Sequence, residues 1–424
     1  MLGEPISVQS EFLDIIGECF TKAVMVIVAT SNNNPYKVTL GAAVKTFSRP
    51  KNPYVYSQIS PIVAESSIAA DKEVTVVGTY GTNYFVVMFG SQYWFVEQSA
   101  LIGKGTKLEN NDNGAYLLQG FSVGTNFCYS FEVNSKNTND KITPDSIHNL
   151  YRFNMNAGGK REEMKIKNNQ TIRLGHANDA ALVSIEGKTY IYVAVYSDNE
   201  ASPVANKFAL VKLQYDGSGN YEEVARYPYK NNERIGGIAY MGNVKINGSN
   251  VDNAVEFLLK NGPYYYTVQV PFANTASNGQ AITIEPKYKF KISFSKGSED
   301  YGSYTGQSIH YDRDKDKLYV PMFGYNPKAN PNPNKPNENV ILVYENIKSE
   351  IKNENKNVQF DNSRIIKKGD KNNIVFEIEG CGFPVGRSPT NENDVLWFNA
   401  NEGTSISAKD RTNGGIYTSF QNIK

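Results

Sequence analysis

A short outline returns five times along the sequence, and it limits what the chain can fold into more than any other feature. Each copy has a glycine, a few small or polar residues and a short apolar run. The copies are Gln119–Val123, Gly175–Val183, Ile235–Tyr240, Gly306–Tyr311 and Gly380–Val385. Repeats of this length indicate a propeller or another array of similar units.

Further runs rich in β-forming residues follow each copy. In the second unit they are Thr189–Val195, Phe208–Leu213 and Tyr221–Tyr227. The glycine-led strand and three more make the four strands of a propeller blade. One blade cannot bury both faces of its sheet, so the blades must pack around a common axis, where glycine suits the crowded innermost strand. The sequence therefore predicts an all-β protein with a five-bladed β-propeller over residues 115–424.

Three segments precede the predicted propeller. Residues 1–44 are predicted to form a short N-terminal helix and strand, because apolar residues follow one helical face over Glu11–Phe20 and a β-forming run follows at Val24–Ala29. Residues 45–103 contain short strands with tight turns, and the polar residues 104–114 are predicted to be a linker. For residues 1–44, packing on the next domain and docking into a larger assembly both stay open.

Residues 74–97 contain three β-forming runs joined by turns at Gly81–Asn83 and Gly90–Gln92, the pattern of an antiparallel meander. This segment resembles a bacterial SH3-type (SH3b) module, which implies a small SH3-like barrel that reads cell-wall polymers. Tyr84, Tyr93 and Trp94 are the candidate ligand-binding side chains of this barrel, since aromatic faces can stack on sugars. The alternative is that these aromatics fill a small core.

Charge and cysteine content exclude several partners. Lys and Arg total 44 and Asp and Glu total 43, so the chain lacks the field that attracts nucleic acid. Cys19, Cys128 and Cys381 have the spacing of neither a disulfide framework nor a zinc site. No cofactor and no metal are expected. The apolar run near the N-terminus is far shorter than a membrane span, and it lacks the basic start of a secretory signal.

No strong catalytic motif is present, and the sequence assigns no catalytic residue. His176 and His310 lie at or near the start of predicted inner strands. Because inner strands converge on the axis, these two side chains are expected to face a common opening. The candidate ligand-binding residues of this propeller mouth are His176, Asn178, Asp179, Gln307, Ser308, His310 and Arg387. Structural hydrogen bonding, a binding pocket, and a metal or acid–base site stay open as interpretations.

Two further chemistries are disfavoured. Five-bladed glycosidases place carboxylates on several inner strands, whereas Asp179 is the one evident carboxylate on the inner strands predicted here. The run Asp312–Lys317 lacks the glycine and the final acidic residue of a calcium loop, and a hairpin turn explains it.

The predicted propeller resembles the helveticin J-like family of large bacteriocin-related proteins from Gram-positive bacteria. The similar features are Leu174–Asp179, Gln119–Phe121 and the hairpin Tyr311–Val320. The resemblance implies an extracellular role at the surface of other bacteria, with the propeller as a lectin-like recognition body. It implies no catalytic residues.

The leading expectation is a non-enzymatic recognition protein that binds bacterial cell-wall or surface glycans, as a bacteriocin or within a phage-like particle. Two weak sites on one chain would gain avidity on a repetitive polymer. One alternative is a carbohydrate-active hydrolase or lyase acting at the propeller mouth. Another is a structural or assembly protein that docks on a protein partner through residues 1–44. The protein is expected to be cytoplasmic until release, and then extracellular or on the target cell, without a classical signal peptide.

Overall fold

The computed structural model is nearly all-β, and apart from the four-residue helix α4 (Ile347–Glu350) and the short 3₁₀ turn η3 (Lys167–Asn169) its described elements are strands. The structure describes residues 36–39, 44–47, 64–68, 73–80, 84–89, 92–97, 102–107, 115–135, 147–155, 160–196, 208–229, 235–273, 286–324, 338–352, 357–367, 375–385, 395–403 and 413–420. Within these ranges no helix has the length and apolar content needed to cross a membrane. The helix and strand predicted within residues 1–30 lie outside them.

A sheet of six strands occupies the N-terminal part, in the order β1-β4-β5-β6-β2-β3. The strands are β1 (Tyr36–Thr39), β2 (Val44–Phe47), β3 (Ala64–Ile68), β4 (Glu73–Tyr80), β5 (Tyr84–Phe89) and β6 (Gln92–Glu97). The antiparallel pairing of β4, β5 and β6 confirms the predicted meander. Because β1 pairs with β4, residues 36–39 belong to this sheet and not to a separate N-terminal element.

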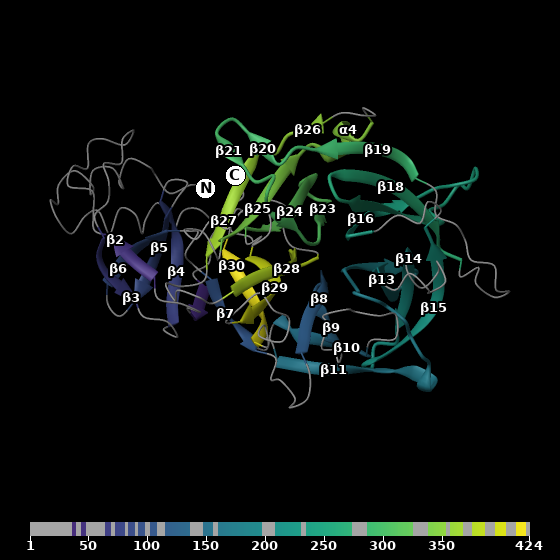
Figure 1. Ribbon diagram of the computed structural model, residues 1–424. Helices are drawn as coiled ribbons and strands as arrows, with labels where there is room; N and C mark the ends of the chain where they lie inside the picture. Colours follow the sequence, from purple (N-terminus) through teal and green to yellow (C-terminus); the bar gives the residue numbers. More distant parts are fainter. Residues whose placement is uncertain are drawn as a thin grey trace, which may run out of the picture.

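Five strands surround a common axis in the rest of the chain, which has a propeller-like architecture (Figure 1). They are β8 (Ala115–Val123), β12 (Asp179–Ile185), β16 (Gly237–Val244), β23 (His310–Asp312) and β28 (Val375–Gly382). Each contacts the next along the chain, and β28 contacts β8. The five inner strands therefore form a closed ring, and residues far apart in sequence meet at its centre.

The remaining strands extend outward from the ring as antiparallel partners. They are β9 (Phe127–Ser135), β10 (Ile147–Asn154), β11 (Lys160–Ile166), β13 (Lys188–Tyr196), β14 (Phe208–Tyr215), β15 (Asn220–Pro228), β17 (Ala254–Asn261), β18 (Tyr264–Pro271), β19 (Pro286–Ile292), β24 (Lys317–Phe323), β25 (Glu338–Glu345), β26 (Asn357–Val358), β27 (Asn362–Lys367), β29 (Val395–Gly403) and β30 (Asn413–Phe420). Three two-residue strands, β20 (Ser295–Lys296), β21 (Glu299–Asp300) and β22 (Thr305–Gly306), complete them. The predicted hairpin around Asp312–Lys317 is confirmed by the pairing of β23 with β24.

The hydrophobic core lies between neighbouring sheets, where large side chains of one sheet pack on the next. Tyr192 on β13 and Phe257 on β17 are both fully buried, and their ring centroids are 4.7 Å apart. Sheets that pack face to face in this way exclude water from both faces. This explains why the outer strands read as long β-forming runs without strict alternation.

The chain closes the ring with a strand from its N-terminal side. β7 (Ile102–Lys107) pairs antiparallel with β30, so the last sheet has the order β28-β29-β30-β7. Figure 1 shows β7 beside β29 and β30, although some 300 positions separate them in the sequence. Residues 104–107 of the predicted linker are thus part of a sheet, because the edge of β30 offers them backbone hydrogen-bond partners.

In two of the five units, the glycine lies inside the inner strand and not at its start. β8 begins at Ala115 and β28 at Val375, each several residues before its glycine. Their registers shift between Leu118 and Phe121 and between Ile378 and Gly380. Such bulges bend a strand and are tolerated where glycine leaves room. The predicted strand starts at Gln119 and Gly380 are therefore corrected.

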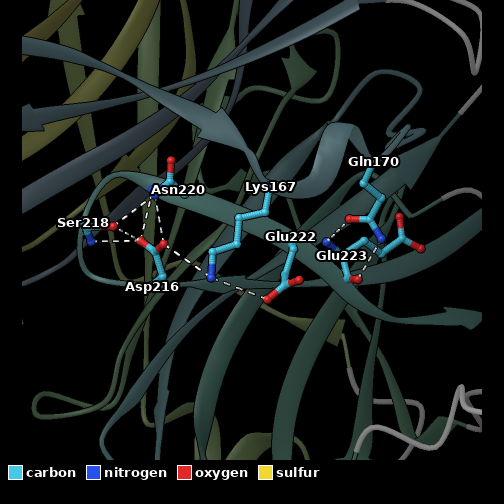
Figure 2. A network of polar contacts seen from close by, with 7 residues as sticks. All are labelled: Lys167, Gln170, Asp216, Ser218, Asn220, Glu222 and Glu223. Atoms are coloured by element: carbon cyan, nitrogen blue, oxygen red, sulfur yellow. Dashed lines mark hydrogen bonds and ion pairs between the residues drawn. The ribbon is translucent and has the colours of Figure 1, made fainter.

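A polar network fastens the connection between β11 and β12 to the neighbouring sheet (Figure 2). The Gln170 side chain donates to Glu223 O at 3.1 Å and accepts from Glu223 N at 2.8 Å, so the amide takes the place of a strand partner. Asp216 accepts hydrogen bonds from Ser218 and Asn220 and forms an ion pair with Lys167 at 3.4 Å. Together they hold η3 against the turn between β14 and β15.

Replacing Gln170 by alanine is expected to lower the free energy of unfolding by about 1 kcal/mol, the usual net worth of such hydrogen bonds at a surface. The loss should appear in urea unfolding as a lower midpoint with an unchanged slope. Thr171→Ala, at the exposed neighbouring position, is the matched control and should be neutral. Equal midpoints for the two variants would contradict a clamping role for Gln170.

Candidate functional site

A cavity of about 520 Å³ lies on the axis of the ring. All five inner strands, or the turns that follow them, contribute to its wall. Its outer part includes exposed residues such as Thr125, Ser184 and Arg313, together with Val385, which is 43% exposed. The cavity therefore opens to solvent at the end of the ring where the inner strands finish.

Small side chains explain why this space stays open. Ser122, Ala180, Ala181 and Ala239 stand at wall positions where larger residues would close the axis. Their strands are fixed in place by contacts between sheets; for example, Leu182 N donates to Ser122 Oγ at 2.8 Å across the β8–β12 seam. A pocket of a few hundred Å³ built on rigid strands is typical of a small-molecule site.

His310, the first residue of β23, lines the cavity. Its Nε2 accepts a hydrogen bond from Phe383 N at 3.4 Å, and its ring lies 5.8 Å from that of Phe383. A Cβ added at Gly382 would come within 3.2 Å of His310 Nδ1, so glycine at that position gives the imidazole its room. Because Nε2 accepts a hydrogen bond, it carries the lone pair in this arrangement.

Arg313 and Tyr240 form a second polar group in the wall. The Arg313 guanidinium carbon lies 4.4 Å from the centroid of the Tyr240 ring, a cation–π arrangement that orients the guanidinium. The Tyr240 hydroxyl donates to Asn243 Oδ1 at 2.8 Å. Burial raises the pKa of Tyr240, and the Arg313 charge partly opposes this, so the phenol stays protonated near neutral pH.

Asp179, a predicted mouth residue, instead forms a buried hub between three inner strands. It is 1% exposed, and its Oδ2 accepts from Ile238 N at 2.9 Å and from Ile309 N at 3.0 Å, while Oδ1 accepts from Ala180 N at 2.9 Å. Burial raises the pKa of Asp179 to about 8, although these donors and the nearby Lys260 charge lower it. Asp179 does not line the cavity.

The structure separates the other predicted mouth residues from His310. The His176 ring stacks on Tyr196 at 5.0 Å, and Asn178 N donates to Ala194 O. Gln307 donates to Glu377, and the Ser308 side chain is fully buried. Within the predicted set, His310 alone is among the cavity-lining residues, and Arg387 lies outside the described residues. His176 and His310 thus do not meet at this opening.

Sequence reasoning missed two buried carboxylates on β28. Glu377 is 5% exposed and accepts from Gln307, while Glu379 is 4% exposed and accepts from Asn401 at 2.6 Å. Burial raises the pKa of Glu379 to about 8. The bulge at Gly380 hid them, because a strand started at that glycine excludes positions 377 and 379.

The aromatic residues predicted for the SH3-like barrel occupy alternating positions. Trp94 is paired with Val87, which is fully buried, and Tyr93 is paired with Met88, which is 36% exposed. Tyr84 is paired with Glu97. Adjacent positions on a strand alternate between the faces of a sheet, so Tyr93 and Trp94 do not share one face.

The cavity-lining residues show what the site can do. No Asp or Glu is among them, and Arg313 is the only lysine or arginine. Across the described part of the chain, no group of three or more His, Cys, Asp or Glu side chains is arranged to hold a metal ion. The wall thus combines aromatic faces, hydroxyls, one imidazole and one guanidinium.

No protein-family model and no curated protein sequence matches this chain. The chain is similar to the solved structure of a GH43 endo-arabinanase from Bacillus licheniformis, with 12% identity, a TM-score of 0.38, and coverage of 73% of this chain and 95% of the other. A GH43 enzyme from Xanthomonas citri has 7% identity and a TM-score of 0.37 over 74% and 90%. A DUF4623 family protein from Bacteroides eggerthii has 12% identity and a TM-score of 0.34 over 85% and 86%.

These similarities correct the leading expectation of a non-enzymatic recognition protein. The similar structures with a stated activity are glycoside hydrolases, which favours the alternative of a carbohydrate-active enzyme. At these identities and TM-scores they assign no residue role and no substrate to this chain.

Proposed function

We propose that this protein is a carbohydrate-active enzyme whose substrate enters the cavity on the axis of the ring. The observation that carries the proposal is the cavity itself: about 520 Å³, open to solvent, and lined from all five inner strands. A site assembled from several strands holds its groups in fixed relative positions, which catalysis requires.

The chemistry of the wall suits a sugar. Tyr240, Tyr129 and Phe127 offer aromatic surface, while Ser122 and Thr125 offer hydroxyls. Sugars present apolar ring faces and many hydroxyl groups, so aromatic surface combined with hydrogen-bonding groups is what recognises them.

The test is turnover of purified polysaccharides, measured as new reducing ends. We expect cleavage by the full chain and its loss in Ser184→Trp, because Ser184 is exposed at the cavity and a large ring there blocks entry. Lys188→Trp, exposed on the next strand and outside the cavity wall, is the matched control and should keep activity. Full activity in both variants, or none in the unmodified chain on neutral and acidic glycans, would refute the proposal.

The finer features of the fold also belong to this proposal. Five inner strands, each with its own outward partners, support a count of five blades. The meander of β4, β5 and β6 supports an SH3-type module. The helveticin J-like resemblance stays a prediction.

A further inference from the structure

The charges around the cavity point to a particular substrate, an inference that rests on the proposed function and deepens it. We propose that the substrate is an acidic polysaccharide containing uronate units, that Arg313 binds the uronate carboxylate, and that His310 is the base of a β-elimination that cleaves the chain. This assigns a substrate class, a binding residue and a catalytic residue.

The first step of the argument is charge. Arg313 makes no ion pair with a carboxylate among the described residues, and the described cavity wall contains no Asp or Glu. Its guanidinium is held over Tyr240 at 4.4 Å, which leaves its N–H groups free to point away from the ring face. A guanidinium with its edge available suits a carboxylate, because the two can form paired hydrogen bonds.

The second step is the location of the carboxylates. Hydrolysis of a glycoside ordinarily needs two carboxyl groups beside the scissile bond. In the described part of the chain, the buried carboxylates of the inner strands, Asp179, Glu377 and Glu379, are each no more than 5% exposed and are absent from the cavity wall. A substrate in the cavity therefore meets an imidazole and a guanidinium, and not a pair of carboxylates.

The third step is chemistry that those two groups can perform. The carbon next to a uronate carboxylate, C5, loses its proton most readily when a cation neutralises the carboxylate. His310 would take that proton through Nε2, after the substrate replaces the long hydrogen bond from Phe383 N. Arg313 would stabilise the charge that then develops on the carboxylate.

The electron balance is complete without another reactant. The electron pair of the broken C5–H bond forms a C4=C5 double bond, and the C4–O bond to the leaving sugar breaks. The glycosidic oxygen leaves with that electron pair and takes a proton from water. The hydroxide so formed accepts the proton held by His310, which restores the neutral imidazole.

The experiment incubates the full chain with homogalacturonan, polyglucuronate and neutral arabinan. Reducing ends measure any cleavage, and ultraviolet absorbance measures the double bond conjugated to the carboxylate. We expect unsaturated products from an acidic polymer, a fall in kcat/KM of at least about 100-fold in His310→Gln, and about 10- to 100-fold in Arg313→Gln with partial recovery in Arg313→Lys. Lys188→Gln, which removes one exposed positive charge elsewhere, should change neither.

The outcomes separate this inference from the proposed function. Cleavage of arabinan alone, or of an acidic polymer into saturated products, would overturn the β-elimination and leave the proposed function standing. No cleavage of any polymer would refute the proposed function. Because His310 packs beside Phe383, unfolding of each variant is measured in parallel. If His310→Gln does not fold, the inference is decided by Arg313→Gln, whose position is exposed: unchanged kcat/KM on acidic polymer would overturn it.

Discussion

Replacing Asp179 by alanine is expected to destabilise the protein by about 3 kcal/mol or more, because three buried N–H donors lose their acceptor and each such loss costs about 1–3 kcal/mol. The donors, Ala180, Ile238 and Ile309, belong to three different inner strands. One carboxylate thus joins units that are adjacent only in the folded ring. Urea unfolding measures the loss, and Asp179→Asn should lose less, since it keeps an acceptor oxygen. A loss below about 1 kcal/mol in the alanine variant would contradict the hub role.

The same carboxylate predicts how stability depends on pH. Burial raises the pKa of Asp179, and that of Glu379, to about 8 in the folded protein, against about 4 in an unfolded chain. The folded state therefore binds these protons more tightly. Their stabilising effect is complete below about pH 4 and is lost as the pH rises through about 8, with a slope of up to about 1.4 kcal/mol per pH unit for each group.

We expect the free energy of unfolding to fall between about pH 5 and about pH 7.5. Glu379→Gln keeps an acceptor for Asn401 but cannot titrate, so its slope should be shallower. Unfolding measured at several pH values decides this. A stability that rises over this range would show that the donors around Asp179 outweigh its burial.

The sequence was sufficient for the architecture because the repeat has a physical cause. Inner strands crowd at an axis, so glycine recurs at each copy, and long β-forming runs mark sheets that are covered on both faces. The contribution of β7 could not be read in the same way. Its sequence, Ile102–Lys107, is short and contains two glycines, and it is a strand because the edge of β30 pairs with it.

The site was harder to predict because sequence does not show which end of the axis a side chain occupies. His176 and Asp179 precede or begin β12, whereas the cavity wall uses residues 180–184 of that strand. Arg313 looked like part of a turn, and it is; its place beside Tyr240 comes from the meeting of β23 and β16, which the local pattern does not encode. Equivalent positions after each inner strand were the one signal that could have found it.

The close approach of β8 and β12 gives the second large effect. A Cβ added to Gly120 would lie 2.5 Å from Ala177 O, the oxygen to which Gly120 N donates at 2.8 Å, and 3.1 Å from Asp179 C. These are backbone atoms, so relief requires the two strands to separate, and Gly120→Ala should cost about 3 kcal/mol. Gly236 is the matched control: it also stands at an inner strand and donates to a backbone oxygen, yet the nearest atom to its added Cβ is 3.8 Å away. Gly236→Ala should therefore change stability by less than about 1 kcal/mol. Thermal and urea unfolding of the two variants compare crowding with glycine content alone, and equal losses in both would mean that the repeated glycines are selected for backbone conformation and not for the contact between inner strands.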